Sequence, residues 1–88
     1  MRDSTISSTG DVYEFVDVLK KESERRGSVS LVARLENALH LGSSGLEILG
    51  AVRQVMIENR SEIERCLGNT GIEKANRVIA FIDKAFGR

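Results

Sequence analysis

The sequence contains no proline and no tryptophan, and its aromatic residues are limited to three phenylalanines and one tyrosine in 88 residues. Proline breaks a helix when it occupies an interior position, so its absence leaves long helices uninterrupted. β-Sheets favour aromatic and β-branched side chains, and the shortage of aromatic residues therefore argues against a sheet-rich fold. Both absences favour an all-α protein.

The sequence also has no long apolar run, no net charge and only one cysteine. A membrane-spanning helix needs roughly 20 apolar residues, so no membrane association is expected, and residues 1–10 lack the apolar run of a secretory signal. Thirteen basic residues balance thirteen acidic ones, which gives no overall support to binding nucleic acid through its phosphates. Cys66 has no second cysteine to pair with inside the chain. Together these features predict a reducing, cytoplasmic location.

Capping residues and apolar stripes at helical spacing divide the chain into successive helices. Asp11 and Glu14 have the spacing of a capping box at the start of the first helix, predicted at 11–26. The second helix is predicted at 29–41. Residues 1–10 are rich in serine and threonine without periodicity, which predicts a disordered tail. The stripes expected to face the core are Val12, Phe15, Val16 and Leu19 in the first helix, and Leu31, Leu35, Ala38 and Leu39 in the second.

The third segment allows two interpretations. Residues 45–67 keep one apolar phase, which favours a single helix that is continuous or kinked near 59–61. The alternative is a bend at Asn59 and a new helix beyond it, because Ser61 and Glu64 also have the spacing of a capping box. The sequence thus predicts a small bundle of four or five short helices joined by short turns that contain glycine and serine.

The last helix, predicted at 71–86, has the widest apolar face. Thr70 and Glu73 supply its capping pair. Its apolar residues, counting Phe81, cover roughly 180° of arc, whereas a helix that faces one core needs roughly 100°. The excess predicts that part of this face covers a partner, and a homodimer is the simplest arrangement. The segments together predict one helical domain over 11–88.

No group of residues in the sequence has the spacing that catalysis, cofactor binding or metal binding requires. His40 falls on the polar side of its helix and is expected to be exposed, whereas Cys66 falls on an apolar face and is expected to be buried. One cysteine and one histidine cannot supply the usual tetrahedral metal site. The turn at 42–45 lacks the strand and the lysine of a phosphate-binding loop, so we interpret it as an interhelical turn with a serine cap. We therefore expect no enzymatic activity, no cofactor and no metal.

Two surfaces are candidates for contact with another protein. The first is the edge of the wide apolar face of the last helix. The second is the flank of a continuous third helix, where two arginines seven residues apart stand beside apolar residues, as at the rim of an interface. The candidate residues are Val78, Phe81 and Ala85 on the first surface, and Leu46, Arg53, Ile57 and Arg60 on the second.

These features predict a non-enzymatic protein-interaction module that forms a homodimer and binds another protein, as a regulatory subunit, an antitoxin or immunity protein, or an adaptor does. One alternative is a nucleic-acid-associated regulator, in which Arg53, Gln54 and Arg60 would contact DNA. Against it, Glu47 and Glu58 on the same helix would repel phosphates. Another alternative is an enzyme or small-ligand carrier that uses a pocket between helices.

Overall fold

The computed structural model describes residues 6–41 and 44–87, and the described residues form four helices and no strand. The prediction of an all-α fold is therefore confirmed. The second helix also has its predicted bounds, whereas the first begins two residues early and the last two segments divide differently. The helices are α1 (Thr9–Arg25), α2 (Val29–Leu41), α3 (Gly45–Glu58) and α4 (Arg60–Ala85).

The first helix begins at Thr9 because Ser8, rather than Asp11, is its capping residue. The Ser8 hydroxyl accepts a hydrogen bond from the Asp11 backbone N–H at 3.2 Å. The chain just before the helix is also held in place, since Ile6 packs against the core. Residues 6–10 of the predicted tail thus belong to the folded unit, and residues 1–5 lie outside the described residues.

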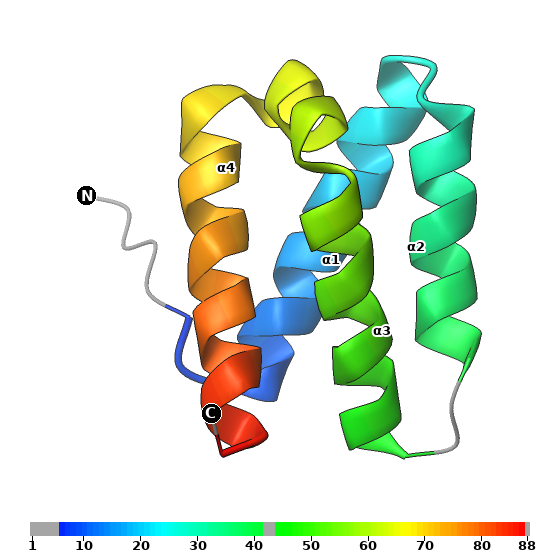
Figure 1. The fold of residues 1–88 in the computed structure, drawn as a ribbon. Coiled ribbons are helices and arrows are strands. Elements are labelled where there is room, and N and C mark those ends of the chain that lie inside the picture. The colour runs from blue at the N-terminus through cyan, green and yellow to red at the C-terminus, as the bar shows by residue number, and fades with distance from the viewer. Residues whose placement is uncertain (1–5, 42–43, 88) are drawn as a thin grey trace.

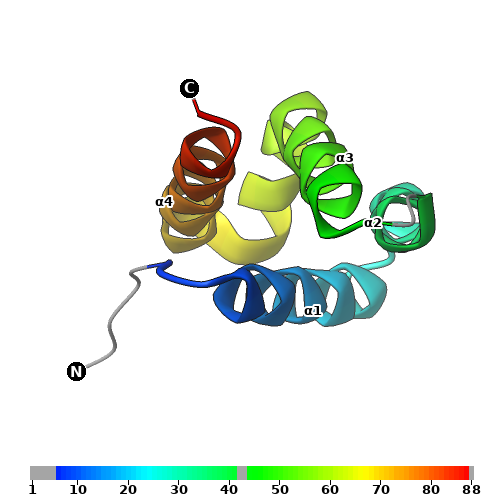
Figure 2. The same ribbon diagram turned by 90° about the horizontal axis from the view of Figure 1, so that it is seen from below.

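The four helices form two layers (Figures 1 and 2). α1 packs against α2 and α4, and α3 packs against the same two helices. In Figure 2, α1 lies lengthwise across the row that α2, α3 and α4 form. The shortest dimension of the molecule is 19 Å, which matches two layers of helices at the usual spacing of about 10 Å. The hydrophobic core lies between the layers.

The predicted stripes of the first two helices build one side of this core. All four stripe residues of α1 are buried, and three of the four in α2 are buried, with Leu39 partly buried against them. Cys66 is buried as predicted, with 3% of its surface exposed. Among the described residues, no helix combines the length and the hydropathy that crossing a membrane requires.

α3 ends at Glu58 and α4 begins at Arg60, so residues 45–67 do not form one unbroken helix. The chain breaks at Asn59 (φ −123°, ψ 32°), within the range predicted for a kink. The Asn59 side-chain amide donates a hydrogen bond to the Val55 carbonyl at 2.8 Å, and the Asn59 backbone N–H donates to the same carbonyl at 3.0 Å. The backbone bond to Val55 is thus kept, and the chain leaves the helical conformation at Asn59 itself, so a continuous apolar phase does not guarantee a continuous helix.

α4 is bent at Gly68, where φ is 74° and ψ is −166°. This region of backbone conformation is accessible almost only to glycine. The bend separates a short segment, residues 60–67, from a long segment, residues 69–85, and it forms the corner at the top of Figure 1. The division falls between the predicted third segment, which ends at residue 67, and the last helix, which was predicted to begin at residue 71.

The wide apolar face of the long segment packs within the chain. α4 packs against both α1 and α3, so it buries two sides at once. Two neighbours inside the same chain account for an apolar arc of roughly 180°. The width of the arc, from which a homodimer was predicted, therefore requires no second copy. The residues that fill the two sides are Ala75, Val78, Ile79 and Ile82, with Phe81 and Phe86 partly buried against the core.

Replacing Gly68 with alanine is expected to lower the free energy of unfolding by about 1–3 kcal/mol, because alanine is strained in this backbone conformation. No atom lies within 4 Å of the position that a Cβ would take, so the loss would come from backbone strain and not from a clash. Urea denaturation monitored by circular dichroism measures the difference.

Gly45→Ala is the matched control for Gly68→Ala. Its Cβ would also meet open space, and its φ lies outside the left-handed region. Alanine has the higher helix propensity, so this variant is expected to be as stable as the original chain or slightly more stable. A Gly68→Ala variant as stable as the Gly45→Ala variant would contradict the strain at the bend.

Candidate functional site

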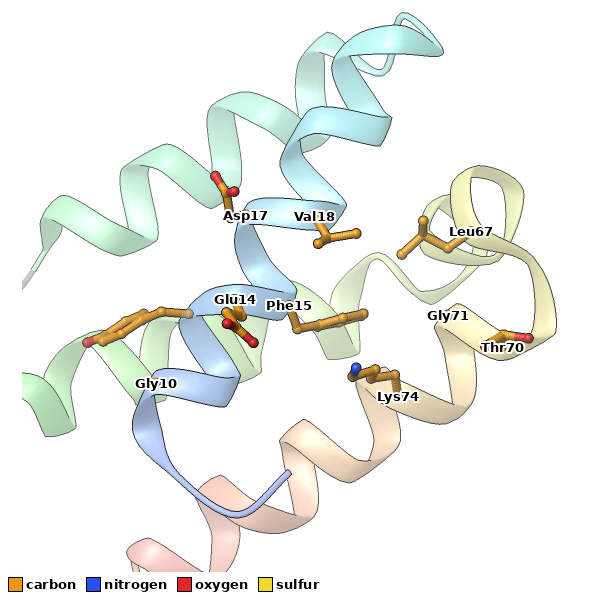
Figure 3. A pocket seen from close by; sticks show the side chains of 10 residues that line it. Gly10, Glu14, Phe15, Asp17, Val18, Leu67, Thr70, Gly71 and Lys74 are labelled. Carbon is orange, nitrogen blue, oxygen red and sulfur yellow. The ribbon is translucent and has the colours of Figure 1, made fainter. Parts of the chain in front are cut away.

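A groove of about 650 Å³ lies between α1 and the bend of α4 (Figure 3). We refer to it as the α1–α4 groove. One wall comes from residues 10–18 of α1, and the other comes from the residues on either side of Gly68 in α4. The lining residues are Gly10, Tyr13, Glu14, Phe15, Asp17 and Val18 from α1, and Leu67, Thr70, Gly71 and Lys74 from α4.

The centre of the groove is apolar. Phe15 belongs to the core stripe of α1 and is 4% exposed, and Leu67 is partly buried. Val18 lies outside that stripe and is 54% exposed. In Figure 3, Val18 and Leu67 point toward one another from the two walls, and Phe15 points into the space between α1 and α4. The groove therefore has apolar side chains at every level, from the buried Phe15 to the solvent-exposed Val18.

Two glycines shape the α4 wall of the groove. Gly68 turns the chain, and Gly71 lets Leu67 fold back over the first turn of the long segment. A Cβ at position 71 would overlap the Leu67 Cβ and would lie 3.1 Å from its Cδ1. Because residue 71 has no side chain, Leu67 can stand in this place and form the wall that faces Val18.

A polar cluster anchors the short segment of α4 to the connection between α1 and α2. Ser28 is buried there, with 4% of its surface exposed. Its hydroxyl donates a hydrogen bond to the Glu62 carboxylate at 2.5 Å and accepts one from the Arg65 guanidinium at 2.9 Å. Arg65 also forms an ion pair with Glu62. Because Leu67 follows two residues after Arg65, this cluster fixes the position of the groove wall.

The same cluster lowers the pKa of the Glu62 carboxyl below its usual value. The main cause is the hydrogen bond from the Ser28 hydroxyl, followed by the hydrogen bond from Arg65, and partial burial opposes both. The pKa values of two other carboxyls are lowered. Hydrogen bonds from the Ser7 backbone and hydroxyl are the main causes for Asp11, and a hydrogen bond from Arg26 is the main cause for Glu22. None of the three carboxyls lines the groove.

Charged side chains stand on the two rims of the groove with opposite signs. Glu14 and Asp17 are exposed on the α1 rim, and Lys74 is partly buried on the α4 rim. Asp17 forms an ion pair with Lys21 at 3.2 Å. Within the described part of the chain, neither Glu14 nor Lys74 forms an ion pair, so both charges remain available to a bound molecule.

The first predicted contact surface does not lie in the groove. Val78 is fully buried, with 0% exposure, and Phe81 is partly buried against the core. Ala85 is exposed at the last turn of α4. The structure therefore places Val78 in the interior of this chain, where it cannot contact a partner, because it lies on the side of α4 that packs within the bundle.

The second predicted surface is divided by the break at Asn59. Leu46 and Ile57 are exposed on α3, by 54% and 37%. Arg53 forms an ion pair with Asp83 of α4 at 2.6 Å. Arg60 is exposed but belongs to α4, so it does not share a helix flank with Arg53 as expected. Their contact with a partner stays a prediction, and none of the four residues lines the groove.

The remaining polar candidates have local partners. His40 is exposed as predicted, and its Nδ1 lies 2.8 Å from the Glu36 carbonyl oxygen one turn earlier. Ser44 caps α3, as expected for the turn at 42–45, by accepting a hydrogen bond from the Glu47 N–H at 3.2 Å; residues 42–43 lie outside the described residues. In the described ranges, no three His, Cys, Asp or Glu side chains are grouped so that they could hold a metal ion.

The α1–α4 groove was not among the surfaces predicted from the sequence. One signal for it is present in the chain: Val18 is a large apolar residue outside the core stripe of its helix. A second is Gly71, a glycine within the first turn of a helical pattern. Neither signal identifies a groove until the helix that faces α1 is known.

Comparison with known proteins finds no matching family model, no similar curated protein and no similar solved structure.

We expect the Ser28 cluster to make the stability of the protein depend on pH. Because the pKa of Glu62 is lowered in the folded state, its contribution is present above the unfolded value of 4.5 and is lost as the pH falls through the folded value. The difference in the free energy of unfolding between the original chain and Glu62→Gln should therefore shrink between pH 6 and pH 3. Urea denaturation at each pH measures this difference. The contributions of the other carboxyls to the pH dependence cancel in the difference, because both proteins carry them.

Ser28→Ala serves as the control for this prediction. It removes the main cause of the lowered pKa while it leaves the carboxylate in place. In the Ser28→Ala background, Glu62→Gln should change the pH dependence of the free energy of unfolding less than it does in the original chain. A difference that stays constant with pH would contradict the assignment.

Proposed function

We propose that this protein is a non-enzymatic interaction module that binds another protein in the α1–α4 groove. The roles open to such a module are those of a regulatory subunit, an antitoxin or immunity protein, or an adaptor. The wide face of α4 is filled by the chain itself, so the proposal rests on the groove and not on that face. The observation that carries the proposal is the exposure of Val18 beside Leu67 and above Phe15.

The exposure of Val18 supports binding because a partner would gain free energy by covering it. Scattered apolar residues on a surface are ordinary. Val18 differs because it faces Leu67 across a groove whose floor is Phe15, so one inserted side chain would contact all three residues. Complete burial of a valine side chain contributes about 1.5–3 kcal/mol, and Val18 begins 54% exposed.

The open shape of the groove favours a protein partner over a small ligand. Its volume of about 650 Å³ lies within the range of small-molecule sites, but those sites enclose about 70–90% of the ligand surface. Here the rim residues Glu14, Asp17 and Val18 are all exposed. A small molecule bound beside them would remain largely in water, whereas a protein would cover both rims.

The carboxyls with altered pKa values give no support to acid–base catalysis in the groove. A carboxyl that acts as a general acid near neutral pH needs a raised pKa. Three carboxyls have altered pKa values, and each of these pKa values is lowered. The three residues, Asp11, Glu22 and Glu62, lie outside the groove. Hydrogen bonds inside the chain keep these groups ionised.

The alternative of a nucleic-acid-associated regulator has less support. Two of the three side chains proposed to contact DNA form bonds within the chain: Arg53 pairs with Asp83 at 2.6 Å, and Gln54 donates to Glu58 at 2.8 Å. The third, Arg60, lies on a different helix. If α3 were a DNA recognition helix, these side chains would have to break their bonds within the chain before they contacted bases.

Val18→Lys is expected to abolish capture of the partner. Binding would bury a charged ammonium group among apolar side chains, and an affinity loss of at least about tenfold is expected. The fold should tolerate the change, since position 18 is exposed and Glu14, four residues earlier on the same helix, would pair with the lysine. The measurement is affinity capture from host lysate with the tagged protein, followed by identification and quantification of the captured proteins.

Val29→Lys is the matched control for Val18→Lys. Val29 is 75% exposed at the start of α2 and does not line the groove. A partner retained by Val29→Lys and lost with Val18→Lys would support the proposal. A partner retained by both variants would place the interface elsewhere, and the absence of any stoichiometric protein partner would reject the interaction role.

A further inference from the structure

We infer that the segment of the partner that occupies the α1–α4 groove is an amphipathic α-helix, with a basic residue on the flank that meets α1 and an acidic residue on the flank that meets Lys74. The inference rests on the proposed function, since it states the chemistry of the partner at the same site. The lining of the groove, the backbone that forms its walls and the charges on its rims each contribute one step.

The walls of the groove favour a helix over an extended peptide. An extended segment needs hydrogen bonds from its backbone to its receptor, as in peptides that add a strand to a sheet edge. The lining consists mostly of side chains of α1 and α4, and the backbone that it includes, at Gly10 and Gly71, lies in first helical turns whose carbonyls are bonded within the helix. An extended peptide would therefore find no backbone acceptors for its N–H groups, which would be unpaired against Phe15 and Leu67. A helix satisfies its backbone internally.

The length of the groove suits a short helix. Its α1 wall runs from Gly10 to Val18, which corresponds to about 12 Å of helix axis at about 1.5 Å per residue. A segment of roughly two to three turns would cover it. Its anchors would be apolar side chains spaced by three or four residues, the spacing that places them along one face of a helix.

The charges on the rims give the bound helix a preferred orientation. Glu14 on α1 and Lys74 on α4 have opposite signs, and within the described residues neither forms an ion pair. A helix with its apolar stripe on the floor of the groove presents one flank to each rim. Attraction therefore favours a basic flank against Glu14 and an acidic flank against Lys74, and it opposes a helix whose two flanks carry the same sign.

The test uses the full-length chain and a phage-displayed library of random peptides of about 12 residues, or roughly three helical turns. Clones that bind the original chain and Val29→Lys but not Val18→Lys are groove binders. The inference expects their apolar residues to recur at helical spacing, with flanks of opposite sign. Synthetic copies should gain helical circular dichroism when they bind.

Peptide selection against variants of this protein with a reversed rim charge tests which flank of the bound helix meets which rim. Lys74→Glu should exchange the acidic flank of selected peptides for a basic one and weaken the originally selected peptides about fivefold. Lys84→Glu is the matched control, because Lys84 is exposed on α4 and does not line the groove. Glu14→Lys and its control Glu24→Lys repeat the comparison on α1.

Groove binders that remain extended when bound, or whose flanks do not respond to Lys74→Glu, would overturn the inference and leave the proposed function in place. The absence of any groove binder would overturn the inference as well. The proposed function is tested separately, by the capture of natural partners with Val18→Lys and Val29→Lys. Its failure would appear in that experiment and not in the peptide library.

Discussion

The backbone conformation of Gly68 is the constraint on which the rest of the structure depends. With φ at 74° and ψ at −166°, this residue turns α4 through a corner that other residues reach only with strain. The corner places Ile63 and Cys66 of the short segment in contact with the core, where they are 0% and 3% exposed. It also leaves Leu67 beside α1. A straight α4 could not fill the end of the core and form a groove wall with neighbouring residues.

Two further contacts hold that corner in place. Gly71 allows Leu67 to approach the long segment, and the buried hydroxyl of Ser28 binds both Glu62 and Arg65 of the short segment. The first contact is steric and the second is polar, so they respond to different changes in sequence or solution. One wall of the groove is thus held both by packing and by hydrogen bonds.

The sequence predicted most of the fold because local patterns determine it. The stripe of Val12, Phe15, Val16 and Leu19 is buried as expected, since period and burial are directly linked in a helix. The break at Asn59 was harder to predict, because an unbroken apolar phase and an asparagine that bonds back to Val55 indicate opposite outcomes. The groove could not be predicted, because it requires knowing that α1 faces α4, and local periodicity does not identify the neighbours of a helix.

The width of an apolar face therefore measures how many neighbours a helix has and not whether one of them belongs to another protein. The face of the long segment of α4 is wide because α1 and α3 both cover it, and Val78 is consequently fully buried. An apolar residue outside the stripe gives a different kind of signal. Val18 contributes little to the core of its own chain, yet it stands opposite Leu67 at the mouth of a groove. The proposed interaction therefore rests on the position of Val18 at the groove, whereas the width of the α4 face is accounted for by packing within the chain.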